Sequence, residues 1–227
     1  MKDLSITLYK FSELSEEVKE ELVDKMRFDI GYDIMDCWND DRMETLKKFS
    51  ELMGVEVYNM RVDYCGMYFN FRFTNETPLM GDYNGKEFYA EDITGKLLRR
   101  YLNNNFMYLA IPRKKYYKYE AGWNKEKNRW NKQRYSRIFY ESWDNYPLTG
   151  VCYDYDILKP IVDCLSKPIS DSYSLYDLVE DALHNFFKEW QHEYECWCEN
   201  QEGCVEEELE NRYCNEVFYE DGTMYAR

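Results

Sequence analysis

The feature that most constrains the fold is a long apolar stripe near the C-terminal end of the chain. Apolar side chains recur at helical spacing over residues 174–200, which predicts one long helix. A stripe this broad is typical of an amphipathic helix that faces a core. Its members are Leu175, Leu178, Val179, Ala182, Leu183, Phe186, Phe187, Trp190 and Tyr194.

The first 75 residues predict a β-α-α-β-β unit. Ser15 stands where a helix N-cap belongs, and Gly54 stands where a glycine ends a helix. Residues 67–73 alternate between apolar and polar side chains, as in a strand with one buried face, and Gly66 before them fits a turn. The expected elements are a strand at 4–10, helices at 16–30 and about 34–53, and strands at 55–63 and 67–73.

The rest of the chain predicts mainly helices. A basic segment, residues 113–137, is expected to be helical after Gly122. An Asp-Gly pair lies between alternating aromatic residues in 216–226, which is a strong signal for a hairpin. The other expected elements are a loop at 74–90 and helices at about 91–108, 156–166 and 204–212.

Together these elements predict the α+β class: a small antiparallel sheet packed with several helices, and a long C-terminal helix followed by a β-hairpin. We find no internal repeat and no clear linker in the sequence. We therefore expect one compact domain over residues 1–227. Within it, 1–75 form the β-α-α-β-β unit, 76–153 form an elaboration that contains the basic segment, and 154–227 form a helical region that ends in the hairpin.

The composition of the chain indicates the cellular compartment in which the protein is expected. No stretch approaches the roughly 18 apolar residues of a membrane span. Residues 1–10 lack the basic and apolar segments of a secretory signal. The eight cysteines are therefore expected to be free thiols in a reducing cytoplasm. We expect a cytoplasmic protein with no membrane partner.

Charge is distributed unevenly along the chain. The formal net charge is −15, with 44 acidic and 29 basic residues. Between Lys96 and Arg137 there are 13 basic and two acidic residues, a local balance of +11, so the remainder carries −26. An acidic protein is a poor ligand for a nucleic-acid backbone and a good one for a basic protein surface. The basic segment differs from the rest of the chain, because its positive charge suits a nucleic-acid backbone.

Cysteine and histidine cluster near the C-terminus but do not predict a reactive centre. A C-x-C pair on a helix points its side chains about 200° apart, which is poor for zinc, and the other spacings match no common zinc module. No cysteine has a recognisable nucleophile context, and no glycine-rich phosphate loop is present. We therefore expect no catalytic residue, no metal site and no cofactor, and hence a protein that is not an enzyme. The residues considered are His184, His192, Cys196, Cys198, Cys204 and Cys214.

Two acidic groups are candidate surfaces for a basic partner. Paired carboxylates can bind metal or act in acid–base chemistry. These groups lack a calcium-loop pattern and a neighbouring histidine, so a solvated helix face or a protein contact surface is the better interpretation. The candidate residues are Asp33, Asp36, Asp40, Asp41, Glu206, Glu207, Glu208 and Glu210.

The basic segment interleaves cations with aromatic rings. Cations that bind phosphates, together with flat rings that stack on bases, are typical of proteins that bind single-stranded nucleic acid. Pairing with the chain's own carboxylates and contact with an acidic protein are the alternatives. The candidate binding residues are Arg113, Lys114, Lys115, Tyr117, Lys118, Trp123, Arg129, Trp130, Lys132 and Arg134.

Both ends of the chain resemble a known family. The segments that carry the resemblance are LYKFSELSEEVKEELVDKM, GVEVYNMRVDYCGMYFNF, VEDALHNFFKEWQHEYECW and EEELENRYCNEVFYEDGTMY. They are similar to small proteins encoded by bacteriophages and prophages, which are often labelled uncharacterised or antitoxins of toxin–antitoxin stability systems. The family has a Gly/Gln-rich turn between its two strands, where this chain has residues 63–66 (DYCG). The basic segment has no clear counterpart in that family.

The resemblance implies an accessory protein of a phage or mobile element that acts in a bacterial cytoplasm. The first prediction is a non-enzymatic inhibitor of a bacterial defence protein, of the anti-CRISPR or anti-restriction type, that binds through acidic surfaces. The alternative is an antitoxin-like regulator that binds RNA or a ribonucleoprotein through residues 113–137.

Overall fold

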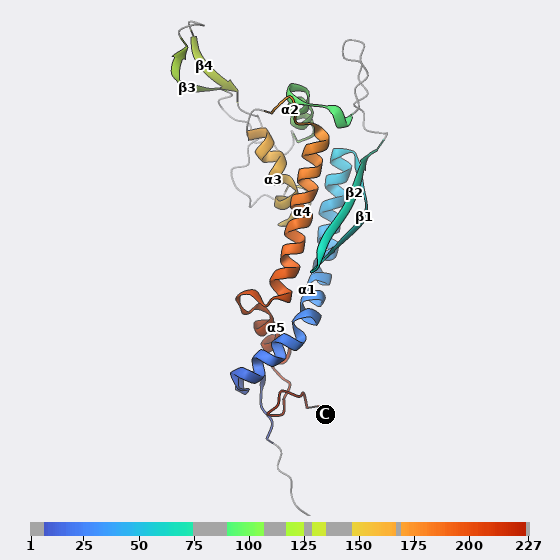
Figure 1. Ribbon diagram of the computed structural model, residues 1–227, viewed down its shortest axis with the longest axis vertical. Coiled ribbons are helices and arrows are strands. Elements are labelled where there is room, and N and C mark those ends of the chain that lie inside the picture. The colour runs from blue at the N-terminus through green and yellow to red at the C-terminus, as the bar shows by residue number, and fades with distance from the viewer. Residues whose placement is uncertain are drawn as a thin grey trace, which may run out of the picture. The chain divides into compact units, whose positions relative to one another are not determined.

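The computed structural model describes residues 7–74, 90–106, 117–124, 129–134, 147–166 and 169–225 (Figure 1). The strands form two separate two-stranded sheets, β1–β2 and β3–β4, and the predicted α+β class is confirmed. The elements are η1 (Phe11–Glu13), α1 (Glu16–Met53), β1 (Val55–Asp63), β2 (Gly66–Phe73), η2 (Ala90–Asp92), α2 (Gly95–Asn105), β3 (Tyr117–Asn124), β4 (Arg129–Arg134), α3 (Tyr153–Ser166), α4 (Leu175–Cys198), η4 (Gln201–Gly203) and α5 (Cys204–Arg212).

The chain divides into two compact units, and neither is one continuous segment. Unit 1 comprises residues 1–40, 62–66 and 190–227, and unit 2 comprises residues 41–61 and 67–189. Helices α1 and α4 contribute residues to both units. The prediction of one compact domain stays a prediction.

The two helices predicted at 16–30 and 34–53 are one helix of 38 residues, α1. Gly31 lies between the two predicted segments. In the structure this glycine is buried inside α1, where a Cβ atom would lie 3.1 Å from Cys198 Sγ and 3.3 Å from Trp197 Cβ. Its missing side chain therefore lets α1 and the end of α4 approach closely. The glycine serves helix packing and does not end the helix.

Unit 1 has its own apolar core, which joins the two ends of the chain. The buried members of this core are Phe11, Leu14, Val23, Ile30, Val205, Leu209 and Phe218. Phe218 exchanges two backbone hydrogen bonds with Tyr9, at 2.9 and 2.8 Å. Because these bonds occupy the backbone groups of Phe218, the C-terminal segment is tied to the N-terminal segment.

The predicted C-terminal hairpin over 216–226 is not formed as a pair of strands. The described residues there make a turn with one isolated antiparallel bridge, between Phe218 and Met224. Gly222 in that turn has a φ of +79°, and a Cβ atom on it would lie 2.9 Å from Val18 Cγ1. The turn thus packs directly on α1. Of the predicted strand at 4–10, the described residues also form only an isolated bridge, at Tyr9.

Unit 2 confirms the β1–β2 hairpin and the long helix. The Phe69 ring stacks on Phe187 with ring centroids 4.8 Å apart, and the Phe71 ring lies 4.8 Å from that of Tyr176. The alternation in β2 therefore places its aromatic face against α4. On the opposite face, Arg72 is exposed and pairs with Glu56 at 2.6 Å. The predicted helices near 91–108 and 156–166 are α2 and α3.

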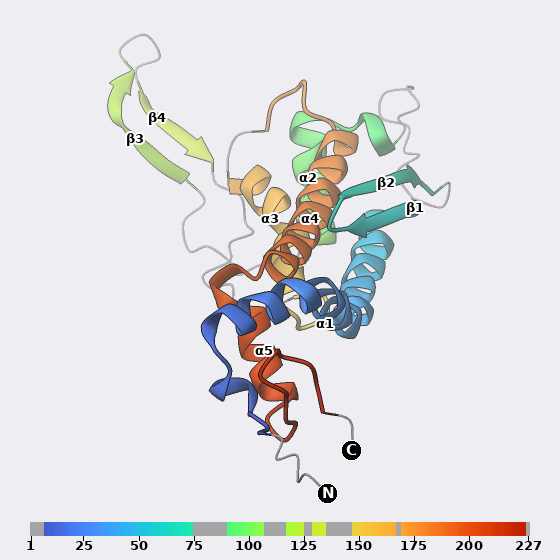
Figure 2. The same ribbon diagram turned by 60° about the horizontal axis from the view of Figure 1, so that its bottom comes forward.

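The prediction of a helix after Gly122 is wrong. Residues of the basic segment instead form β3 and β4, which pair as an antiparallel two-stranded ribbon (Figure 2). Tyrosine and tryptophan favour strands over helices, and four of them lie in these two strands. Residues 75–89, within the predicted loop at 74–90, lie outside the described residues.

The described helices are too polar to serve as membrane spans. Helices α1 and α4, with 38 and 24 residues, carry charged side chains throughout. Over the described ranges, no helix combines the length and the apolar character that crossing a membrane requires.

Candidate interaction surfaces

The two units differ sharply in charge. Unit 1 contains 23 acidic and seven basic residues, a net charge of −16. Unit 2 contains 21 acidic and 22 basic residues, a net charge of +1. Unit 1 therefore accounts for the net negative charge of the whole chain.

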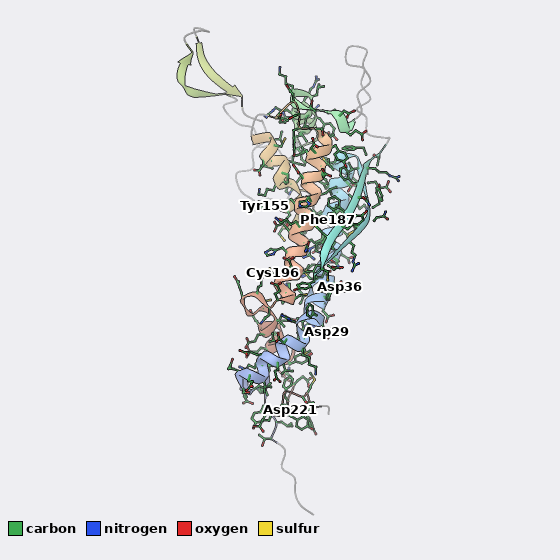
Figure 3. All side chains as sticks on the ribbon, in the orientation of Figure 1. Asp29, Asp36, Tyr155, Phe187, Cys196 and Asp221 are labelled. Carbon is green, nitrogen blue, oxygen red and sulfur yellow. The ribbon has the colours of Figure 1, made fainter. Side chains whose placement is uncertain are left out.

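An acidic stripe runs along α1 within unit 1. We define it as Asp29, Asp33, Asp36 and Asp40. Their spacings of four, three and four residues keep them within an arc of about 60°, because each residue of an α-helix turns about 100°. All four side chains are exposed, and Figure 3 labels Asp29 and Asp36 on the helix. Asp33, Asp36 and Asp40 were predicted from the sequence, whereas Asp29 was not, although it shares their helical spacing.

One member of this stripe, Asp33, is linked to α5 by an arginine. Arg212 Nε lies 2.6 Å from Glu208 Oε1, and its Nη1 lies 3.1 Å from Asp33 Oδ2. The hydrogen bond with Glu208 is the main reason that the pKa of Arg212 is raised. The structure thus joins the two predicted acidic groups, and it neutralises part of their charge.

The other glutamates of α5 differ in exposure. Glu207 and Glu210 are exposed, whereas Glu206 is half-buried. The carboxylates of Glu206 and Glu210 act together with Glu16 to raise the pKa of Lys19, with the Glu16 hydrogen bond as the largest cause. Part of the α5 charge therefore faces a cation of the same unit.

Three stripe carboxylates remain available to a partner. Over the described ranges, Asp29, Asp36 and Asp40 take part in no ion pair. Asp36 accepts one hydrogen bond, from Asn39 Nδ2 at 3.0 Å. The predicted Asp41 is also exposed, but it belongs to unit 2. The free charge is therefore concentrated on the middle of α1.

Exposed aromatic rings lie beside the acidic stripe. Phe28 and Tyr32 are 38% and 39% exposed. The Phe28 ring meets Tyr64 edge to face at 5.5 Å between centroids, and the Tyr32 ring lies 5.3 Å from that of Tyr194. Because each ring packs against a second ring, it is held in place while one side stays open to solvent.

The ribbon contains the described part of the basic segment. The predicted residues Tyr117, Lys118 and Trp123 lie in β3, and Arg129, Trp130, Lys132 and Arg134 lie in β4. The predicted residues Arg113, Lys114 and Lys115 lie outside the described residues.

A cysteine, a histidine and a glutamate come together on α4. Cys196 Sγ lies 3.7 Å from His192 Nε2, and His192 Nδ1 lies 3.5 Å from Glu195 Oε2. Burial raises the pKa of Cys196, and four neighbouring carboxylates raise it further. The thiol is thus stabilised in its neutral form, whereas a nucleophilic cysteine needs a thiolate. Within the described residues, no group of three or more His, Cys, Asp or Glu side chains is arranged to hold a metal ion.

The carboxylate of Asp154 lies in a buried polar network that the sequence did not predict. Its Oδ2 accepts hydrogen bonds from the backbone N–H groups of Leu148, Thr149 and Gly150, at 2.7, 2.9 and 3.3 Å. Its Oδ1 accepts from the hydroxyls of Thr149 and Thr45, at 2.8 and 3.2 Å. With no solvent exposure, this carboxylate anchors the segment before α3 and does not face a ligand.

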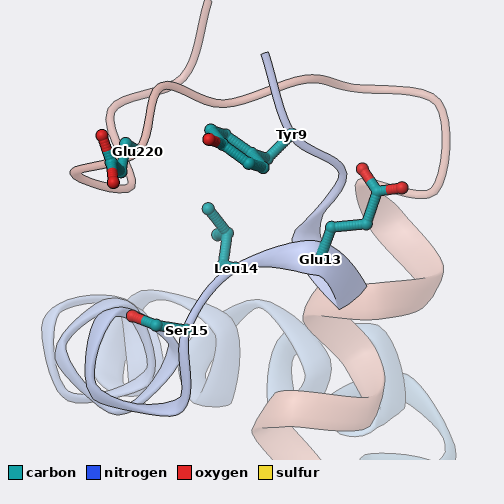
Figure 4. Close-up of a pocket in the computed structure, with 5 residues that line it drawn as sticks. All are labelled: Tyr9, Glu13, Leu14, Ser15 and Glu220. Atoms are coloured by element: carbon teal, nitrogen blue, oxygen red, sulfur yellow. The ribbon is translucent and has the colours of Figure 1, made fainter. Parts of the chain in front are cut away.

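A pocket of about 280 Å³ lies between η1 and the C-terminal segment (Figure 4). Its lining residues are Tyr9, Glu13, Leu14, Ser15 and Glu220. The Glu13 carboxylate already accepts a hydrogen bond from the Lys10 N–H at 2.8 Å. Ligand sites usually occupy about 300–1,000 Å³ and are mostly apolar. This pocket is smaller than that range and has two glutamates among its five lining residues, so it does not resemble one.

Comparison with known proteins gives no match to this chain among protein-family models, curated proteins or solved structures. The acidic stripe and the ribbon are therefore interpreted from their own chemistry.

Proposed function

We propose that this chain is a non-enzymatic binding protein whose acidic stripe occupies a basic surface of another protein. The observation that carries the proposal is the set of exposed carboxylates on the middle of α1 that form no ion pair with the described residues, within a unit of net charge −16. A lysine- or arginine-rich groove is the complementary surface. Such complementarity gives fast association and selects against acidic partners.

The rings beside the stripe would add contact area to this electrostatic attraction. Phe28 and Tyr32 are partly exposed and are held by packing against Tyr64 and Tyr194. Aromatic rings are enriched at the centres of protein interfaces, and a guanidinium group stacks well on their faces. Because the two rings are already restrained by this packing, they would lose little conformational freedom on binding.

The host context comes from the resemblance to phage and prophage proteins. It points to a bacterial cytoplasm and to a target in a defence system, of the CRISPR or restriction type. Such effectors hold nucleic acid in grooves lined with lysine and arginine. A protein that offers an array of carboxylates would compete with the nucleic acid for that groove.

The test is plasmid interference in bacteria that each carry one defence system. Expression of the wild-type chain should restore transformation by a targeted plasmid in at least one strain. The variant Asp36→Lys/Asp40→Lys should lose this effect. Its control, Glu17→Lys/Glu20→Lys, makes the same charge change at exposed positions of α1 outside the acidic stripe, and it should keep the effect.

Two outcomes would contradict the proposal. In one, the wild-type chain restores transformation in none of the strains. In the other, the two variants behave alike, so that net charge alone matters and the stripe does not. Soluble expression and equal unfolding temperatures of both variants are the controls for folding.

A further inference from the structure

The two strands of the ribbon pair in a register that places their aromatic residues on one face. Tyr117 pairs with Arg134, Tyr119 with Lys132, and Trp123 with Trp130. An irregularity between Tyr119 and Trp123 adjusts the register. Residues 130, 132 and 134 alternate along β4, and paired residues of an antiparallel sheet share a face. These three pairs therefore share one face, which we call the aromatic face.

The opposite face has a different composition. It holds the pair Lys118–Gln133 and the pair Asn124–Arg129. Position 131 on this face is an asparagine. All four aromatic residues of the two strands thus lie on the aromatic face, together with one lysine and one arginine. This separation could not be seen while the segment was expected to be a helix.

Rings and cations on one side of a short ribbon are the chemistry that recognises single-stranded nucleic acid. Unstacked bases gain about 1–3 kcal/mol each by stacking on aromatic side chains, and lysine and arginine bind the phosphates. We propose that the aromatic face of β3–β4 binds single-stranded nucleic acid. This site is separate from the acidic stripe, so it does not depend on the function proposed above.

The net charge of −15 does not forbid such a site. At physiological salt, charges more than about 8 Å apart are largely screened. The two strands themselves carry four basic residues and one acidic residue, a local charge of +3 at the ribbon. Duplexes present their bases already stacked and paired, so a platform of rings favours single strands over them.

The experiment measures fluorescence polarisation of labelled 12-nucleotide probes with the full-length protein. The probes are oligo(dT), oligo(rU) and a 12-base-pair duplex, at 50 mM salt. We expect both single strands to bind at least 5-fold more tightly than the duplex. A preference between the two single-stranded probes assigns the site to DNA or to RNA.

Two charge-reversal variants locate the binding face. Lys132→Glu/Arg134→Glu alters the aromatic face, and Lys118→Glu/Arg129→Glu makes the same charge change on the opposite face. The first should weaken binding at least 10-fold, and the second at most about 3-fold. The first should also reduce the slope of log affinity against log salt by about 1.4, since each lost phosphate contact of a single strand contributes about 0.7.

Ring stacking is tested separately. Trp130→Phe keeps a flat ring and should bind within about 2-fold of wild type, whereas Trp130→Leu should bind at least 5-fold more weakly. Equal weakening by both charge-reversal variants would overturn the proposal, because binding would then follow overall charge. Failure of the wild-type protein to bind any single-stranded probe at 50 mM salt would overturn it as well.

Discussion

Replacing Asp154 by alanine should destabilise unit 2 strongly, because this one buried carboxylate accepts five hydrogen bonds. The hydroxyls of Thr45 and Thr149 lie 3.1 Å apart and can still bond to each other after the substitution. Gly150 is exposed, so water can reach its N–H group. The amides of Leu148 and Thr149 are half-buried and would lose their acceptor.

An unsatisfied buried donor costs about 1–3 kcal/mol. Two such amides give about 2–6 kcal/mol, so we expect a loss of about 4 kcal/mol in the free energy of unfolding. For a chain of this size the melting temperature should fall by about 8–16 °C. The control, Asp163→Ala on the same helix, removes an exposed pair with Lys159 at 3.0 Å and should cost less than about 1 kcal/mol.

Urea unfolding followed by circular dichroism measures both variants. A loss below about 1 kcal/mol for Asp154→Ala, or equal losses for the two variants, would refute the reasoning. Either result would mean that water or a rearranged segment replaces the carboxylate at little cost.

Three further predictions concern packing, pH and thiol reactivity. Gly31→Val should lower the free energy of unfolding by about 1–3 kcal/mol, because its side chain would overlap Cys198 and Trp197; a neutral effect in urea unfolding would show that the helices can separate. Hydrogen bonds from Ser174 lower the pKa of Asp177, so the stability that Asp177 adds to the start of α4 is present above about pH 4 and is lost as the pH falls through this depressed pKa. Asp177→Ala should therefore cost about 0.3–1 kcal/mol at pH 7 and less as the pH is lowered below 4, and a cost that does not change with pH would contradict this cause. Burial raises the pKa of Cys164 to about 11, so mass spectrometry should find it alkylated at least 10-fold more slowly at pH 8 than the exposed Cys37, and equal rates would contradict its burial.

Much of the helical architecture could be predicted because its signals are local. The apolar stripe of α4 and the alternation in β2 each reflect one buried face, and both elements appear where the sequence placed them. Gly31 shows the limit of such reasoning. A glycine between two helical segments has the same sequence signal whether it ends a helix or lets another helix approach, and only the position of Cys198 decides between them.

The ribbon and the termini were mispredicted for different reasons. Charged residues in the basic segment masked the strand preference of its tyrosines and tryptophans, so the pairing of Trp123 with Trp130 was not foreseen. At the C-terminus, the Asp-Gly turn forms, and Phe218 bridges to Met224 on one side and to Tyr9 on the other, but the described residues there form only isolated bridges and no pair of strands. The terminal pairing depends on a partner distant in sequence, whereas the ribbon pairs neighbouring segments.

The candidate surfaces were predicted in part. Residues of both acidic groups are exposed, yet the link from Asp33 through Arg212 to Glu208 joins residues that are far apart in sequence. The network around Asp154 is invisible in the sequence for the same reason, because the donors come from Thr45 and from the segment before α3.

The most direct test of the proposed function is the salt dependence of affinity for the purified defence protein that the interference assay identifies. Calorimetry between 50 and 300 mM salt should show wild-type affinity falling at least 10-fold, since exposed charges are screened over that range. Asp36→Lys/Asp40→Lys should bind at least 10-fold more weakly at 50 mM salt, and Glu17→Lys/Glu20→Lys should stay within about 3-fold of wild type. An affinity that is independent of salt, and unchanged by reversing Asp36 and Asp40, would contradict the claim that the acidic stripe is the binding surface.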